Sequence, residues 1–240
     1  MIDKPVRRKR LRRVTALALA TLAFYLVAAY VFLPWRWTSY ERARPGAPDA
    51  MVTRTAEGIP GDPINISLVG SEADVLRAMH AAGWSAADPV TWKTSLEIIG
   101  SVVFDRPFRH APVSPLFVEG RREDLAFEIP VGVSADRRRH VRFWKMPDLQ
   151  DGRPVWIGSV TFDRGVGFSR LTGAVTHHIA PDVDAERTFL GASLRATGLV
   201  SQGRDISGEP SPPGARNGEG DPYRTDGNVL QLVLRATAPP

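Results

Sequence analysis

The densest group of metal-ligating side chains lies in one short stretch, Thr176–Arg187. Two histidines and three acids fall within it: His177, His178, Asp182, Asp184 and Glu186. Imidazole and carboxylate groups bind zinc and harder divalent metals, so this stretch is a candidate metal site. Adjacent histidines on a strand point to opposite faces, so one of them at most would share a site with the acids.

Helix capping is the alternative interpretation of these acids. An aspartate at position 182 or 184 suits the N-cap of a following helix, and Glu186 suits the positive end of the helix dipole. Because capping is the commonest use of acids before an apolar helical pattern, it is the interpretation that we favour.

Basic residues form a second cluster in the run RRRHVR at 137–142, after Arg121-Arg122. Arginine binds phosphate and carboxylate through two parallel hydrogen bonds, and a strand would place His140 and Arg142 on one face. An anionic ligand such as a lipid headgroup is therefore one hypothesis, and a solvated, charged strand edge is the other. Asp163-Arg164 could be a further part of the site or an internal ion pair. The candidate ligand-binding residues are Arg121, Arg139, His140, Arg142, Asp163 and Arg164.

Signatures of well-known catalytic sites are missing from the sequence. There is no GxxxxGK[ST] phosphate loop, no GxSxG elbow and no HExxH motif. Gly165-Val166-Gly167 lacks a third glycine and is predicted to be a turn, and Ser114 has no base that spacing can assign to it. With no cysteine, the chain has no thiolate nucleophile and no disulfide. Catalytic residues and cofactors therefore stay unknown.

Periodicity predicts an α+β fold, in which about three helices cover one face of a mainly antiparallel sheet. The first helix starts at a capping box, Ser71 with Asp74, and stops at Gly83. The other helices are predicted over Trp92–Phe104 and Asp184–Thr197, with a turn at Asp151-Gly152 and a long surface loop over 201–228. The predicted strands are Ile64–Val69, Leu116–Val118, Leu125–Ile129, His140–Trp144, Val155–Phe162 and Val229–Leu234.

An uncharged run of twenty residues, Val14–Leu33, precedes this domain. Such a run forms about 30 Å of helix, which matches the hydrocarbon core of a bilayer. A cleaved signal peptide is the alternative, but this run is longer than a typical signal core and holds bulky Phe24, Tyr25, Tyr30 and Phe32. We therefore predict a basic tail at 1–13, a transmembrane helix at 14–33, a stalk at 34–60 and one folded domain at 61–240.

Charge predicts the orientation of the anchor. The tail of residues 1–13 carries seven basic residues and one acid, a net charge of +6, whereas the whole chain has +5. The remaining residues therefore sum to −1, which argues against a nucleic-acid-binding body. The positive-inside rule predicts a cytoplasmic N-terminus and a domain outside the cell membrane.

Eight phrases together resemble the LssY C-terminal domain family of bacteria: GDPINISLVGS (61–71), AAGW (81–84), APVSPLF (111–117), GRREDLAFE (120–128), RRHVRFW (138–144), VWIGSVTFDRGVGFS (155–169), THHIAPDVDAER (176–187) and DPYRTDG (221–227). The resemblance covers about residues 61–235. It implies a domain that occurs behind a membrane anchor or fused to polytopic membrane modules, with no assigned reaction. On the matching phrases, Asp124 and Glu128 join the polar candidates named above.

Two functions follow as hypotheses. The first is a membrane-anchored accessory domain that binds an anionic envelope ligand, such as an anionic lipid, or a neighbouring membrane protein. The alternative is a metal-assisted hydrolase acting on a phosphorylated lipid, with His177, His178, Asp182 and Asp184 near the metal and Arg139 and Arg142 on the phosphate.

Overall fold

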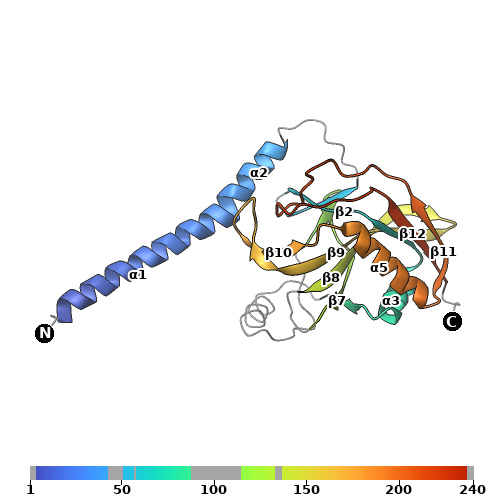
Figure 1. Ribbon diagram of the computed structural model, residues 1–240, viewed down its shortest axis with the longest axis horizontal. Helices are drawn as coiled ribbons and strands as arrows, with labels where there is room; N and C mark the ends of the chain where they lie inside the picture. The colour runs from blue at the N-terminus through green and yellow to red at the C-terminus, as the bar shows by residue number, and fades with distance from the viewer. Residues whose placement is uncertain (1–3, 43–50, 57, 88–114, 133–136, 237–240) are drawn as a thin grey trace.

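The computed structural model describes residues 4–42, 51–56, 58–87, 115–132 and 137–236 (Figure 1). Its elements are α1 Lys4–Val27, η1 Ala28–Phe32, α2 Leu33–Arg42, β1 Val52–Arg54, β2 Pro60–Pro63, β3 Ile66–Val69, α3 Glu72–Ala81, β4 Ser85–Ala86, β5 Phe117–Val118, β6 Arg121–Arg122, β7 Leu125–Pro130, β8 Arg138–Gln150, β9 Arg153–Phe168, β10 Val175–Ile179, α5 Val183–Ala196, β11 Val200–Ile206 and β12 Val229–Leu234. The predicted helix Trp92–Phe104 and Ser114 lie outside the described residues.

A single long helix, made of α1, η1 and α2, projects from the body (Figure 1). Its part Lys9–Tyr40 is long and apolar enough to cross a membrane, since an 18-residue window within it has a mean hydropathy of 2.2, and it contains the predicted run 14–33. The helix continues past Pro34 to Arg42. A π-helical turn, η1, stands close before this proline, where the backbone ladder must accommodate a residue without an N–H donor.

Two sheets form the body. The larger has the strand order β11-β12-β3-β9-β8-β7-β4, with β10 paired to β9, and only β12 and β3 run parallel among its described strands. The smaller sheet has the order β2-β1-β5-β6. Helices α3 and α5 pack against the larger sheet, so the predicted α+β class is confirmed.

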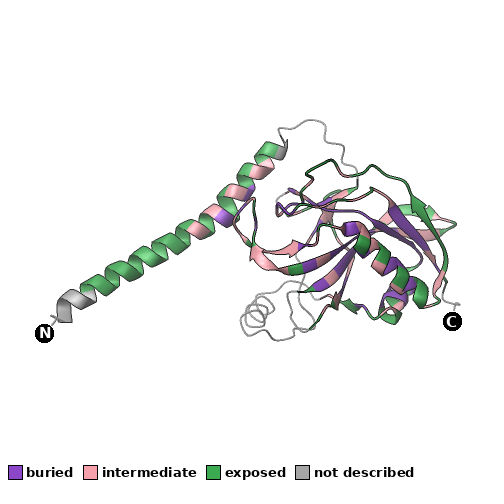
Figure 2. Ribbon diagram, viewed as in Figure 1, coloured by how far each residue is buried: buried purple, intermediate pink, exposed green. Residues whose placement is uncertain are grey.

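Alternation along β8 and β9 separates an apolar face from a polar one. Val141 and Phe143 of β8, with Trp156 and Val160 of β9, join a core that α3 and α5 complete. The alternate residues are polar and buried as well: Arg138, His140, Arg142, Ser159, Thr161 and Asp163. Figure 2 shows these central strands in the colour of buried residues. Both faces of the central hairpin are therefore covered.

The predicted helix caps and the predicted turn at Asp151-Gly152 are confirmed. The capping box of α3 is present, with the Asp74 N–H donating to the Ser71 hydroxyl and the Ser71 N–H to the Asp74 carboxylate. Asp151 and Gly152 have φ of 53° and 74° and join β8 to β9. Asp182 caps α5, as the capping interpretation predicted.

Three local predictions were wrong. Gly165–Gly167 lies inside β9 and pairs with β10. Gly167 is accommodated there because the His178 ring packs where its side chain would stand. Val200–Ile206 forms β11, an edge strand held by backbone pairing to β12 although its side chains show no apolar alternation. Val52–Arg54, assigned above to the stalk, forms β1 and pairs with β2.

Asn65 connects β3, β9 and α5, and its loss should cost stability. Its side chain donates to the carbonyls of Val160 and Val183 and accepts from the Val160 N–H. Asn65→Ala leaves these groups unpaired, so we expect the free energy of unfolding to fall by about 2–4 kcal/mol in urea denaturation. Ser67→Ala is the control, since this equally buried hydroxyl has no hydrogen bond within the described residues. Equal losses in both variants would contradict the assignment.

Candidate functional site

A partly open cavity of about 70 Å³ lies against the polar face of β8 and β9. Its walls include Asp62 of β2, the β8–β9 residues His140, Arg142, Thr161 and Asp163, and Thr176 and His177 of β10. Asn217, Gly218 and Glu219, from the loop before β12, complete it. The site is therefore assembled from four strands and one distant loop.

Strand register places the charged side chains in rows. His140 pairs with Thr161 on one side and Glu128 of β7 on the other, and Arg138 pairs with Asp163. The Nε2 atom of His140 and the Oδ2 atom of Asp163 lie 3.1 Å apart. Their alignment is too poor for a hydrogen bond, and neither atom has a partner of that kind in the described part of the chain. Both face the cavity from side chains that are about 95 % buried.

Each buried arginine has a carboxylate beside it. The Arg138 guanidinium lies 3.4 Å from Glu128 and 3.2 Å from the His177 Nε2. The Arg142 guanidinium lies 3.9 Å from Asp62, which is a loose pair. Asp62 also accepts a hydrogen bond of 3.2 Å from the Asn217 amide.

Burial shifts the pKa of three of these groups. Desolvation raises the pKa of Asp163 to about 8, against the lowering effect of the nearby arginines Arg138 and Arg142. Desolvation lowers the pKa of His140 well below its usual value, and the same two arginines lower it further. The pKa of Asp62 is also raised by desolvation. At neutral pH the Asp163 carboxyl is therefore protonated and His140 is neutral.

Four of the residues predicted from the sequence meet in this cavity: His140, Arg142, Asp163 and His177. As predicted, His140 and Arg142 share one face of a strand. The prediction for adjacent histidines also holds, since His178 points away and its Nδ1 lies 2.8 Å from Asp221.

The other basic candidates lie elsewhere. Arg139 is on the helix side of β8, where it donates to Glu186 at 2.6 Å and stacks on Phe189. Arg121 is on the surface and donates to the Lys145 carbonyl. Arg164 is exposed, whereas its neighbour Asp163 is buried beside His140, so the suggested ion pair between them is wrong.

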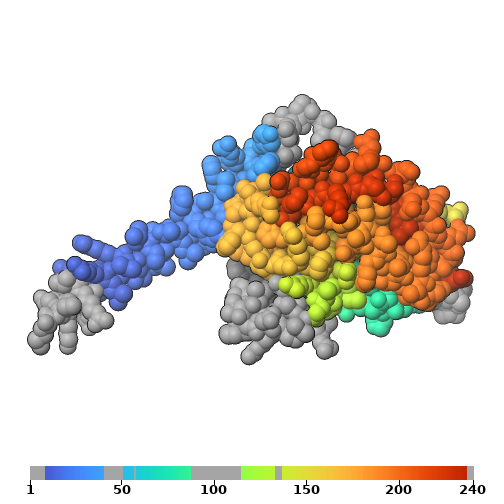
Figure 3. All heavy atoms as spheres, viewed as in Figure 1, coloured from blue at the N-terminus to red at the C-terminus, as the bar shows by residue number. Residues whose placement is uncertain are grey.

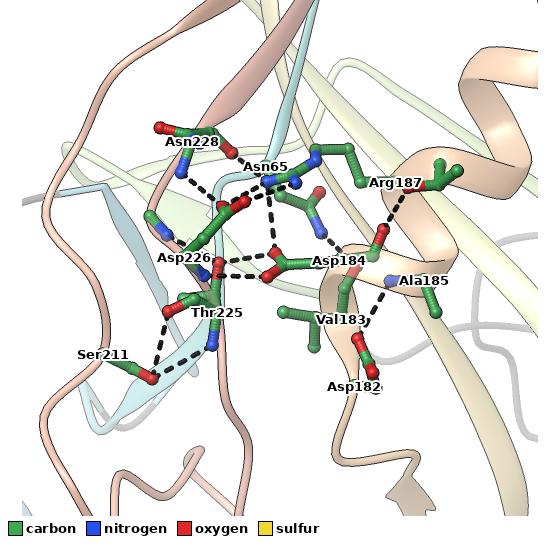
Figure 4. Close-up of polar contacts among 12 residues, drawn as sticks. Asn65, Asp182, Val183, Asp184, Ala185, Arg187, Ser211, Thr225, Asp226 and Asn228 are labelled. Carbon is green, nitrogen blue, oxygen red and sulfur yellow. Dashed lines mark hydrogen bonds and ion pairs between the residues drawn. The ribbon is translucent and has the colours of Figure 1, made fainter.

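The acids after His178 hold α5 and the loop before β12 (Figure 4). Asp182 accepts from the Ala185 N–H, and Asp184 accepts from the Thr225 hydroxyl and the Asp226 N–H. Arg187 donates to Asp226 through both terminal nitrogens, which lowers the pKa of Asp226 to about 2. Within the described ranges, no three histidine or acidic side chains lie close enough together to hold a metal ion.

Sequence reasoning missed three residues in or beside this cavity: Asp62 and Asn217, which line it, and Arg138, which contacts His177 of its wall. A signal existed for Arg138, which precedes His140 by two residues and so shares its strand face. Asp62 stands in a phrase quoted above, but nothing in the sequence pairs it with β8. Only the fold brings Asn217 and Asp62, which are 155 residues apart, into contact.

Stability should depend on pH through Asp163. Its pKa is about 8 in the folded chain and 3.8 ordinarily, so its contribution to stability is complete below about pH 4 and is lost as the pH rises to about 8. Asp163→Asn cannot ionise. We therefore expect its Tm to fall less than that of the wild type between about pH 5 and pH 9, by about 3 °C or more. Asp148→Asn, at an exposed position of β8, is the control and should follow the wild type. Parallel curves for all three proteins would refute a buried, protonated Asp163.

Comparison with known proteins gives one match. The family model of the LssY C-terminus matches residues 44–229. No curated protein and no solved structure matches the chain. The match begins before β1 and ends at the first residue of β12, so it spans the strands and the loop that build the cavity. The chain belongs to the LssY C-terminus family.

Proposed function

We propose that this protein is a single-pass membrane-anchored binding domain whose cavity takes a small anionic group, such as a phosphate or a carboxylate. The observation that carries the proposal is the pair of buried atoms at the cavity wall, His140 Nε2 and Asp163 Oδ2, that have no hydrogen bond within the described residues. A buried polar atom costs free energy unless a hydrogen bond compensates it. An anion in the cavity would accept hydrogen bonds from both groups, and the Arg142 guanidinium on the same wall would attract its charge.

The other polar groups of the cavity suit an anion because they can donate. Thr161 and Thr176 carry hydroxyl groups, and a protonated Asp163 donates where an ionised one would repel. One tautomer of His140 also donates from Nε2, the atom without a hydrogen bond noted above. A water molecule needs about 10–15 Å³ of such a cavity, so there is room for about five waters. This space is enough for one oxyanion.

The anchor assigned to this domain is the helix Lys9–Tyr40. Its basic flank favours a cytoplasmic N-terminus and a domain on the extracytoplasmic side of the cell membrane. Retention of the helix is supported by its contacts with the body, since the Tyr25 hydroxyl donates to the Gly173 carbonyl. If the helix were cleaved off as a signal peptide, the mature domain would lose this contact.

Cysteine labelling tests the orientation, because the natural chain contains no cysteine. In spheroplasts, Ser201→Cys on the exposed strand β11 should react with a membrane-impermeant maleimide. Val6→Cys in the basic tail should react only after permeabilisation. The reverse pattern would place the domain in the cytoplasm and refute the orientation.

Sulfate binding tests the cavity, because sulfate keeps its charge across the useful pH range. With the full chain in detergent, sulfate at ten times its Kd should stabilise the fold by about 1.4 kcal/mol, seen as a higher Tm. Arg142→Gln should keep only the general salt effect of sulfate, whereas Arg164→Gln, an exposed arginine, should respond like the wild type. Binding should weaken from about pH 7 to pH 9, as Asp163 ionises beside the ligand.

The result that contradicts the proposal is an equal response of all three proteins to sulfate. If Arg142→Gln does not fold, Thr161→Val serves in its place, since it removes a donor from the cavity without removing a charge.

A further inference from the structure

The hairpin of β9 and β10 touches the membrane helix at its tip (Figures 1 and 3). The Tyr25 hydroxyl donates to the Gly173 carbonyl at 2.9 Å, and the Val175 N–H donates to the Tyr30 hydroxyl at 3.0 Å. Both tyrosines belong to the uncharged run 14–33. Along the helix they stand about 12 Å and 4.5 Å before Leu33, so the tip reaches the level of the apolar segment.

The hairpin tip carries exposed apolar side chains, which suit a position beside the apolar segment of the helix. Phe168 and Val175 face each other across the hairpin and are 64 % and 55 % exposed. Exposed apolar side chains beside a membrane helix can be buried in lipid. In lipid an unpaired backbone group is costly, and the two tyrosine hydroxyls pair the backbone groups of Gly173 and Val175.

A groove of about 280 Å³ runs between the helix and this tip. Ala29, Tyr30 and Pro34 line it on the helix side, and Ala174 and Val175 line it on the hairpin side. Its remaining lining mixes apolar side chains, such as Ala56 and Ile59, with three threonines and Glu219. The apolar side chains that the helix and the hairpin tip contribute suit contact with hydrocarbon.

The groove and the cavity lie next to each other. Five residues line both: Thr55, Leu116, Thr176, Gly218 and Glu219. The groove at the helix and the hairpin tip therefore shares one wall with the cavity that holds Arg142. Glu219 is the one acid on the shared wall. The hydrogen-bond donors His140, Arg142 and Thr161 line the cavity but not the groove.

We propose that the cavity takes the phosphate of an anionic lipid, which enters laterally through the groove and leaves its acyl chains beside the helix. This inference rests on the proposed function, because it names the source of the anionic group that the cavity binds. A free anion of the same chemistry would need no groove along the helix and no apolar tip at the level of the bilayer.

Nanodiscs of two compositions test the lipid source. The full chain is placed in phosphatidylcholine alone and in phosphatidylcholine mixed with phosphatidylglycerol, and its Tm is compared. We expect the anionic lipid to raise the Tm by about 3–5 °C. Soluble glycerol 1-phosphate, added to the phosphatidylcholine discs at the same total concentration, should give a clearly smaller rise.

A groove-filling variant separates entry from binding. Ala174→Trp fills the groove at the hairpin tip and should lose the response to phosphatidylglycerol while keeping the response to sulfate in detergent. Leu171→Trp adds the same ring to the same tip outside the groove and should respond like the wild type. Attraction between the basic tail and anionic lipid is common to all these proteins, so it does not produce the difference.

The outcomes distinguish the two proposals. No response to phosphatidylglycerol, with sulfate binding intact, overturns lipid entry and leaves the anion-binding cavity. An equal response to glycerol 1-phosphate, or a full lipid response in Ala174→Trp, also overturns it. Loss of both the sulfate and the lipid response in the wild type refutes the proposed function itself.

Discussion

Burial of charge on one face of the central hairpin is the constraint on which the rest of this structure depends. Arg138, His140, Arg142 and Asp163 are all less than one tenth exposed. Removing such groups from water is costly, and a sheet covered by helices on one side alone would leave them solvated. The smaller sheet, β10 and the loop at 217–221 form the second cover. Beside the charged groups, this cover also buries a smaller apolar cluster of Ile64, Leu116 and Trp144.

The separation of the two faces depends on register. Val141 and Phe143 pack in the core with α3 and α5, whereas the alternate residues His140 and Arg142 face the cavity. A shift of one residue would put arginine into the apolar core, so the pairing of β8 with β9 is strongly specified. Asp151-Gly152, with both φ positive, sets the pairing next to the turn, where Gln150 stands opposite Arg153. An irregularity between Lys145 and Leu149 then changes the register before the two strands reach the buried site, so the turn alone does not determine which residues pair there.

This explains which features could be predicted. The apolar helix, the capping box at Ser71 and the shared face of His140 and Arg142 depend on residues close in sequence, and each was read correctly. Asn217 reaches Asp62 across 155 residues, and no period or motif links them. The acids at 182–186 were also metal candidates, because a metal, a cap, a loop and a distant arginine can each use a carboxylate, and composition cannot tell these uses apart. Edge strand β11 was missed because backbone pairing alone maintains it.

Strand β9 connects the cavity with the proposed membrane anchor. It carries Asp163 at the cavity and Phe168 at the tip, five residues or about 17 Å further along the strand. The same strand pairs with β3 and β8 in the core, so the distance between cavity and tip is set by the sheet. The tip in turn is tied to the helix through Tyr25 and Tyr30. The proposed anchor and the proposed binding cavity are therefore connected by one strand of the sheet, and this geometry favours a ligand that is itself confined to the membrane.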